Sequence, residues 1–124
     1  MSAKPQDPYA VVIPALQGHL GSGVTVGASK RGETGYVWVR LVGGSHRDVV
    51  LDSVVVDFLI FGDNRSERMN TAAEIRAYLL AQNYTNGPIL AASDVMLPQD
   101  MPDPVRDENT ITMLTSRVTL KWLS

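Results

Sequence analysis

The two histidines are the residues best suited to general-base catalysis or metal binding. His46 is followed by Arg47 and Asp48, and both kinds of site usually place a histidine beside a carboxylate. This tripeptide lies between two predicted strands, where exposed polar residues are typical of a turn, so we interpret it as a turn. His19 lies near the end of a predicted helix, where a cation complements the helix dipole. We therefore expect neither histidine to catalyse a reaction or to bind a metal.

The serines and the glycine-containing segments do not match nucleophile or phosphate-binding motifs. Gly21-Ser22-Gly23 is one residue short of the Gly-x-Ser-x-Gly pattern and follows a predicted helix rather than a strand. Gly27-Ala28-Ser29-Lys30 lacks the Gly-Lys-Ser or Gly-Lys-Thr triplet of a phosphate-binding loop. The sequence contains no cysteine, which excludes disulfides, thiolate metal ligands and cysteine nucleophiles. We predict no catalytic machinery and no cofactor.

The segment from Pro98 to Asn109 is acidic and rich in proline. Calcium-binding loops place oxygen ligands at alternate positions around a central glycine, but this segment has no glycine and is stiffened by its prolines. Because a stiff loop loses less entropy on binding, we interpret it as a contact element. Its candidate contact residues are Pro98, Asp100, Pro102, Asp103 and Pro104.

Three further residues are candidate contacts with another subunit or a partner. Lys30 and Arg31 form the densest basic stretch and begin a polar, glycine-containing loop. Trp122 lies near the end of the last predicted strand. It is either a core residue or an interface residue, since tryptophan is enriched among the residues that dominate binding energy.

Hydrophobic periodicity predicts two helices and five strands. Asp7 and Pro8 are typical of a helix start, and we expect a first helix to about Leu20 that Pro14 kinks or interrupts. A second helix is predicted from about Ser66 to Asn83. The predicted strands are Val24–Ala28, Tyr36–Val42, Val49–Phe61, Ile89–Leu97 and Thr110–Trp122, with Gly43-Gly44-Ser45 ending the second strand.

This order, α-β-β-β-α-β-β, predicts a single α+β domain over residues 1–124. We expect a mixed or antiparallel sheet of about five strands with both helices on one face, because two helices cannot cover both faces. The other face must then meet water or a partner. The length of 124 residues and the 44% hydrophobic and 19% charged content fit one globular domain with a proper core.

The charge distribution argues against tight nucleic-acid binding and against membrane insertion. The formal net charge is −2, and the sequence shows no basic stripe of the kind that grips phosphates. No apolar run approaches the roughly 20 residues that span a bilayer. The longest, Val54–Phe61, is interrupted by Asp57.

An ordered series of segments resembles the tail terminator (tail-completion) proteins of long-tailed bacteriophages. After an early helix come a Gly-Val-x-Val strand, an aromatic-valine strand ending in Gly-Gly, and a basic turn with a buried strand. An alanine-bearing helix and a Leu-Pro loop with a Pro-Asp-Pro end follow, and a terminal strand closes the series. These parts are Gly23–Val26, Tyr36–Gly44, Arg47 with Asp52–Phe58, Ala72–Leu80, Leu97–Pro104 and Thr110–Trp122.

The resemblance implies a structural protein of the virion, located at the head–tail junction and assembled in the host cytoplasm. It implies a homo-oligomeric ring, usually of six copies, that caps the tail tube, stops its growth and presents a docking face to the head-completion or connector protein. DNA would pass through the lumen without tight binding. Two alternatives stay open: a head–tail connector (neck) protein, and a small enzyme or ligand-binding domain that uses His46, Asp48 or the acidic loop.

Overall fold

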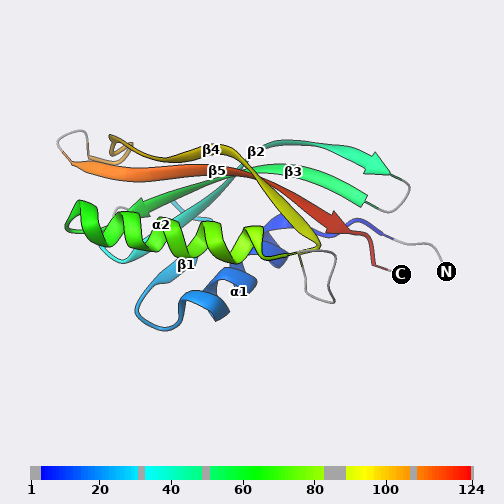
Figure 1. Cartoon of the computed structure of the whole chain (residues 1–124), viewed down its shortest axis with the longest axis horizontal. Helices are drawn as coiled ribbons and strands as arrows, with labels where there is room; N and C mark the ends of the chain where they lie inside the picture. Colours follow the sequence, from blue (N-terminus) through cyan, green and yellow to red (C-terminus); the bar gives the residue numbers. More distant parts are fainter. Residues whose placement is uncertain (1–3, 31–32, 49–50, 83–88, 107–108, 124) are drawn as a thin grey trace.

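The computed structural model describes residues 4–30, 33–48, 51–82, 89–106 and 109–123, and these form two helices and five strands in the predicted order (Figure 1). The helices are α1 (Pro8–Leu20) and α2 (Arg65–Leu80). The strands are β1 (Thr25–Gly27), β2 (Tyr36–Asp48), β3 (Leu51–Phe61), β4 (Ala91–Pro102) and β5 (Thr110–Lys121). The predicted α+β fold is therefore confirmed.

Helix α1 begins and ends as its sequence predicts, but the proline inside it does not interrupt it. The Asp7 carboxylate accepts a hydrogen bond from the Tyr9 backbone N–H at 3.1 Å, and Pro8 is the first helical residue. Pro14 removes one donor from the helix, and the carbonyl left without a partner is that of Ala10. Both residues are exposed, so water can satisfy that carbonyl.

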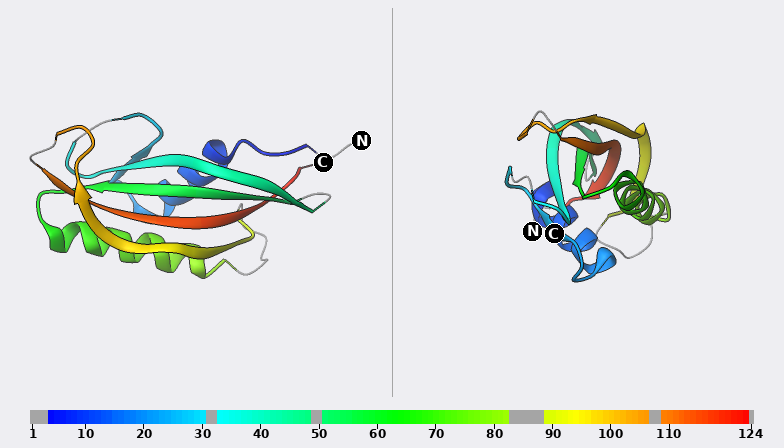
Figure 2. Two further views of the ribbon diagram at one scale, coloured as in Figure 1. Left: turned by 90° about the horizontal axis from the view of Figure 1, so that it is seen from above. Right: turned by 90° about the vertical axis from the view of Figure 1, so that its left-hand side faces the viewer.

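The five strands form one mixed sheet in the order β1-β2-β3-β5-β4. Strands β2, β3, β5 and β4 pair antiparallel, whereas β1 pairs parallel with the first three residues of β2. Figure 2 shows the sheet as a strongly twisted layer. The end of the β2–β3 hairpin lies beside both ends of the chain, where Lys4 and Leu123 form an isolated bridge (Figure 1).

Two strands are longer than the sequence predicts. Strand β2 continues through Gly43 and Gly44 with a register shift after Leu41, so the expected strand end at these glycines is wrong. A Cβ atom on Gly44 would lie 2.8 Å from the Ser53 carbonyl oxygen, so this glycine permits close approach of β3. The tripeptide beginning at His46 is consequently part of β2 rather than a turn.

Strand β4 likewise extends past its predicted end at Leu97 and runs through Pro98 to Pro102. It lies at the edge of the sheet, where a proline costs no ladder hydrogen bond if its nitrogen points outward. Two register shifts against β5, between Asp94 and Met96 and between Met96 and Gln99, accommodate the extra residues. The predicted loop therefore begins only after Pro102.

Both helices pack on one sheet face, as predicted (Figure 1). Alternate residues of β2, β3 and β5 point to this face and join helix residues in one buried cluster. Its largest fully buried members include Leu16 of α1, Ile75 and Leu79 of α2, Phe58 of β3, and Leu114 and Leu120 of β5.

The opposite sheet face, which we call the helix-free face, has a hydrophobic cluster of its own. Tyr36, Leu59, Phe61 and Ile111 are buried there, although no helix residue belongs to this cluster. They are flanked by the partly buried side chains of Trp38, Met101 and Met113. The prediction that this face meets only water or a partner is thus incomplete, because neighbouring large side chains cover part of it.

Candidate contact surfaces

A fixed arginine lies beside a tryptophan on the helix-free face. Cross-strand register places Arg40 of β2 opposite Asp57 of β3 and Asp57 opposite Thr115 of β5. Arg40 Nη2 donates to Asp57 Oδ2 at 2.8 Å, and Thr115 Oγ1 donates to Asp57 Oδ1 at 2.6 Å. The Arg40 guanidinium carbon also lies 5.3 Å from the centre of the Trp38 ring, within the range of a cation–π contact.

These contacts restrict the conformations of Arg40 and Trp38, which are both partly accessible on the helix-free face. The Asp57 side chain is 9% exposed, whereas that of Arg40 is 39% exposed and Trp38 is half-buried. A partner would meet an arginine and a tryptophan whose conformations are already restricted, which lowers the entropy cost of contact. Tryptophan and arginine are also the residue types that most often dominate interface energy.

The sequence alone does not indicate a role for Arg40 or Asp57, because their charge pair depends on the strand register. The available signal was weak: Asp57 is the one charged residue in the apolar run Val54–Phe61. A buried charge in such a run usually has a partner, and the structure identifies Arg40 as that partner.

Two aspartates of β4 bind arginines of α2 and fix the edge strand to the helix. Arg76 donates to both carboxylate oxygens of Asp94, with its shortest bond at 2.8 Å. Hydrogen bonding to Asp94, followed by the charge of that carboxylate, raises the pKa of Arg76 above its usual range. Asp100 accepts hydrogen bonds from Arg65 Nε at 2.8 Å and from Thr112 Oγ1 at 3.2 Å.

The pKa of Asp100 is lowered, mainly by its hydrogen bond to Arg65 and further by Thr112 and by the charge of Arg68. Because the folded value lies below the unfolded one, the carboxylate stabilises the fold above the usual aspartate pKa, and this contribution is lost as the pH falls through the folded value. We expect Asp100→Asn to melt at a lower temperature than the wild type at pH 7, with the gap closing below about pH 4. Melting curves from pH 7 to pH 3 measure this, and a gap that stays constant or widens in acid contradicts it.

The candidate contacts of the acidic segment fall into different environments. Pro98 is half-buried within β4, Asp100 is bound to Arg65 as above, and Pro102 and Pro104 are exposed. Asp103 is only 3% exposed, and its Oδ1 accepts a bond from the Val105 backbone N–H at 2.7 Å. Val105 is an exposed apolar residue of the same segment, and Val95 and Leu97 are exposed just before it on β4. The segment and the end of β4 thus combine several prolines with apolar side chains that a partner can cover.

The three other candidate contacts lie elsewhere. Lys30 is exposed in the connection between β1 and β2, and Arg31 lies outside the described residues. Trp122 is half-buried, and its Nε1 donates to Asp52 Oδ2 at 2.9 Å. The Trp122 ring lies 5.2 Å from the ring of His46. The indole therefore binds the end of β5 to the β2–β3 hairpin, and its role toward another subunit remains a prediction.

Each histidine lies close to a carboxylate. His46 Nδ1 lies 3.2 Å from Asp52 Oδ1, and His19 Nε2 lies 3.3 Å from Glu74 Oε2. The His19 ring also stacks on Tyr78 at 4.6 Å. Within the described ranges, no group of three or more His, Asp or Glu side chains is arranged to hold a metal ion.

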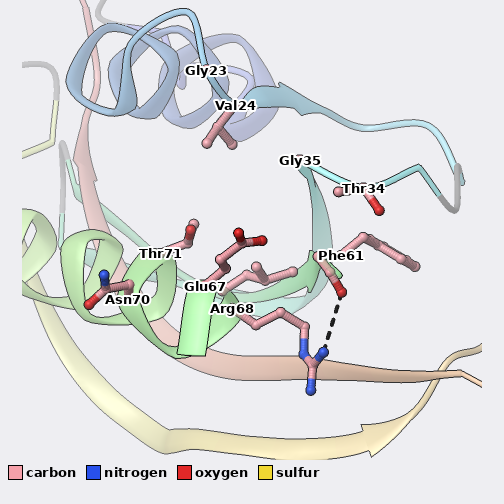
Figure 3. A pocket seen from close by; sticks show the side chains of 11 residues that line it. Gly23, Val24, Thr34, Gly35, Phe61, Glu67, Arg68, Asn70 and Thr71 are labelled. Carbon is pink, nitrogen blue, oxygen red and sulfur yellow. Dashed lines mark hydrogen bonds between the residues drawn. The ribbon is translucent and has the colours of Figure 1, made fainter. Parts of the chain in front are cut away.

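Two adjacent hollows lie at the end of the sheet where β3 leads into α2. Their volumes are about 410 and 320 Å³, and they share Thr34, Phe61, Gly62 and Arg68. In Figure 3, Arg68 extends from α2 toward the end of β3, where its Nη1 donates to the Gly62 carbonyl at 3.3 Å. Its Nε donates to Thr112 Oγ1 at 3.2 Å. The larger hollow faces the start of α2, and the smaller one faces the β4–β5 loop.

No protein-family model and no curated protein matches this sequence. Among the described residues, no helix is both long enough and apolar enough to cross a membrane.

Proposed function

We propose that this chain is a subunit of the ring that caps a bacteriophage tail tube, ends its polymerisation and presents a docking face to the head or connector. The family part of this proposal comes from the ordered sequence resemblance. The observation that carries it on the structural side is the helix-free face, on which Trp38 and Arg40 are held in place without a covering helix.

A ring requires a contact between two different surfaces of the subunit, repeated at a fixed rotation until it closes. This fold offers two candidate surfaces, namely the helix-free face around Trp38 and Arg40 of β2, and the outer edge of the sheet along β4 with its exposed apolar residues. The formal charge of −2 also suits a lumen through which DNA passes, because few cations are available to bind phosphates.

The decisive experiment is electron microscopy of particles produced without this protein. We expect tails of abnormal length, because nothing would stop the tube from growing, and normal lengths when the protein is supplied in trans. Filled heads without tails would instead identify a connector, the alternative function. In parallel, light scattering should give a multiple of the 13.5 kDa chain mass, for the protein alone or with tube protein. A strict monomer that does not bind tube ends contradicts the proposal.

A further inference from the structure

The smaller of the two hollows is lined by two aspartates that have no cationic partner among the residues that the structure describes. We call it the acidic hollow, and its lining includes Thr34, Asp63, Arg68, Asp103, Asn109 and Ile111. Asp103 is 97% buried, and its Oδ1 accepts a hydrogen bond from the Val105 backbone N–H, which carries no charge. Asp63 accepts a bond from the Thr34 hydroxyl at 2.8 Å. Neither carboxylate forms an ion pair within the part of the chain that the structure describes.

The arginine in the acidic hollow does not neutralise these carboxylates. Arg68 is directed to the Thr112 hydroxyl, to the Gly62 carbonyl and, at 3.7 Å, to Asp100. A carboxylate that is buried without a counter-ion is costly. The acidic hollow is therefore suited to a guanidinium or ammonium group that comes from outside the subunit.

An arginine that could supply the missing positive charge, Arg117, lies on the helix-free face. Arg117 of β5 is exposed, and it makes no hydrogen bond or ion pair with the described residues. Its cross-strand neighbours are Val55 on β3 and Ser93 on β4, which carry no charge. The fold thus places on this face an exposed guanidinium that has no charged partner among the described residues and no charged residue directly opposite it.

These two features cannot meet within one subunit. Ile111 lines the acidic hollow and lies six positions before Arg117 on the same strand, which is a separation of about 20 Å at the rise of a β-strand. Lys30 and Arg106 belong to the connections that also supply Thr34, Asp103 and Asn109 to the hollow. Among the described residues, however, neither forms an ion pair with Asp63 or Asp103. The pairing therefore requires two copies that present different surfaces to each other.

We infer that Arg117 of one subunit binds in the acidic hollow of the neighbouring copy, next to Asp63 and Asp103. The planar guanidinium can donate to two carboxylates at once, which a lysine ammonium does with less directional fit. Such a contact is head-to-tail, so it closes into a ring at a set rotation. The inference deepens the proposed function and rests on it, since it names the surfaces that would hold the ring together.

Charge reversal tests the pairing. Both Arg117→Glu and Asp63→Lys should raise the protein concentration needed for assembly at least about tenfold, and the two changes combined in one chain should largely restore it. Lys121→Glu is the matched control, because Lys121 lies on the same strand and sheet face and undergoes the same change of charge. It should assemble as the wild type does. Light scattering measures the assembled mass, and unchanged melting temperatures show that the exposed substitutions leave the fold intact.

Disulfide trapping provides an independent test, because the chain contains no cysteine of its own. A chain carrying both Asp63→Cys and Arg117→Cys should form a ladder of covalent multimers on oxidation, whereas either single cysteine should not. If wild-type rings form but neither charge reversal nor trapping has any effect, the inference is wrong while the proposed function stands. If the wild type forms no assembly, either alone or on tube ends, both are wrong.

Discussion

Replacing Leu59 with alanine is expected to lower the free energy of unfolding by about 2–5 kcal/mol, although Leu59 lies on the sheet face that no helix covers. Its side chain is fully buried in the cluster with Tyr36, Phe61 and Ile111. The substitution removes apolar contacts and leaves a cavity that neighbouring strands cannot collapse into. Urea denaturation followed by circular dichroism, at a concentration where the protein is monomeric, measures the loss.

Val55→Ala is the matched control for Leu59→Ala. Val55 lies on the same strand and the same face, but it is only half-buried and no helix-free cluster includes it. Its truncation removes fewer atoms from a partly solvated position, so the expected loss is clearly smaller. Equal losses for the two variants would show that the helix-free cluster contributes no more to stability than ordinary surface packing.

The helix-side core could be predicted from the sequence because alternation identifies one face of each strand. Val37 and Val39 alternate with Tyr36 and Trp38, and helical spacing selects the inward residues of both helices. The second cluster is harder to predict. The run from Phe58 to Phe61 is apolar at every position, which indicates burial on both faces, but alternation cannot say what covers the second one.

Strand ends were less predictable than strand existence, because glycine and proline act according to their tertiary surroundings. The sequence predicts a strand end at Gly44, yet this glycine lets β2 and β3 approach closely. It also predicts the start of a loop at Pro98, yet an edge strand with two register shifts accommodates this proline. A single sequence does not show which strand lies beside Gly44 or beside Pro98, so these effects could not be predicted.

The candidate contact residues illustrate the same limit for side chains. Composition alone identified the acidic, proline-rich segment, but it could not pair Asp100 with Arg65, which lies 35 positions away. It also could not separate the buried Asp103 from the exposed Pro104. Similarly, the sequence pattern indicates only that Arg117 is a polar residue on the exposed face of the last strand. Its position gains significance only together with a hollow in which Asp63 and Asp103 have no ion-pair partner among the described residues.

Arg68→Met is expected to cost about 3 kcal/mol of unfolding free energy, whereas Arg65→Met should cost far less. Both arginines belong to α2, both reach Asp100, and arginine and methionine have similar helix propensities. They differ in burial: the Arg68 side chain is 8% exposed and that of Arg65 is 65% exposed.

The difference follows from what each substitution leaves behind. Without Arg68, the Gly62 carbonyl loses its charged donor, and the fully buried Thr112 hydroxyl loses one of its two partners. Without Arg65, Asp100 is still partly solvated and keeps Thr112, and exposed ion pairs contribute little because water and salt screen them. Paired urea titrations at pH 7, in low and in high salt, measure both losses. The Arg68 loss should persist in high salt, and a salt-sensitive loss of equal size in both variants would mean that Arg68 acts only as a surface charge.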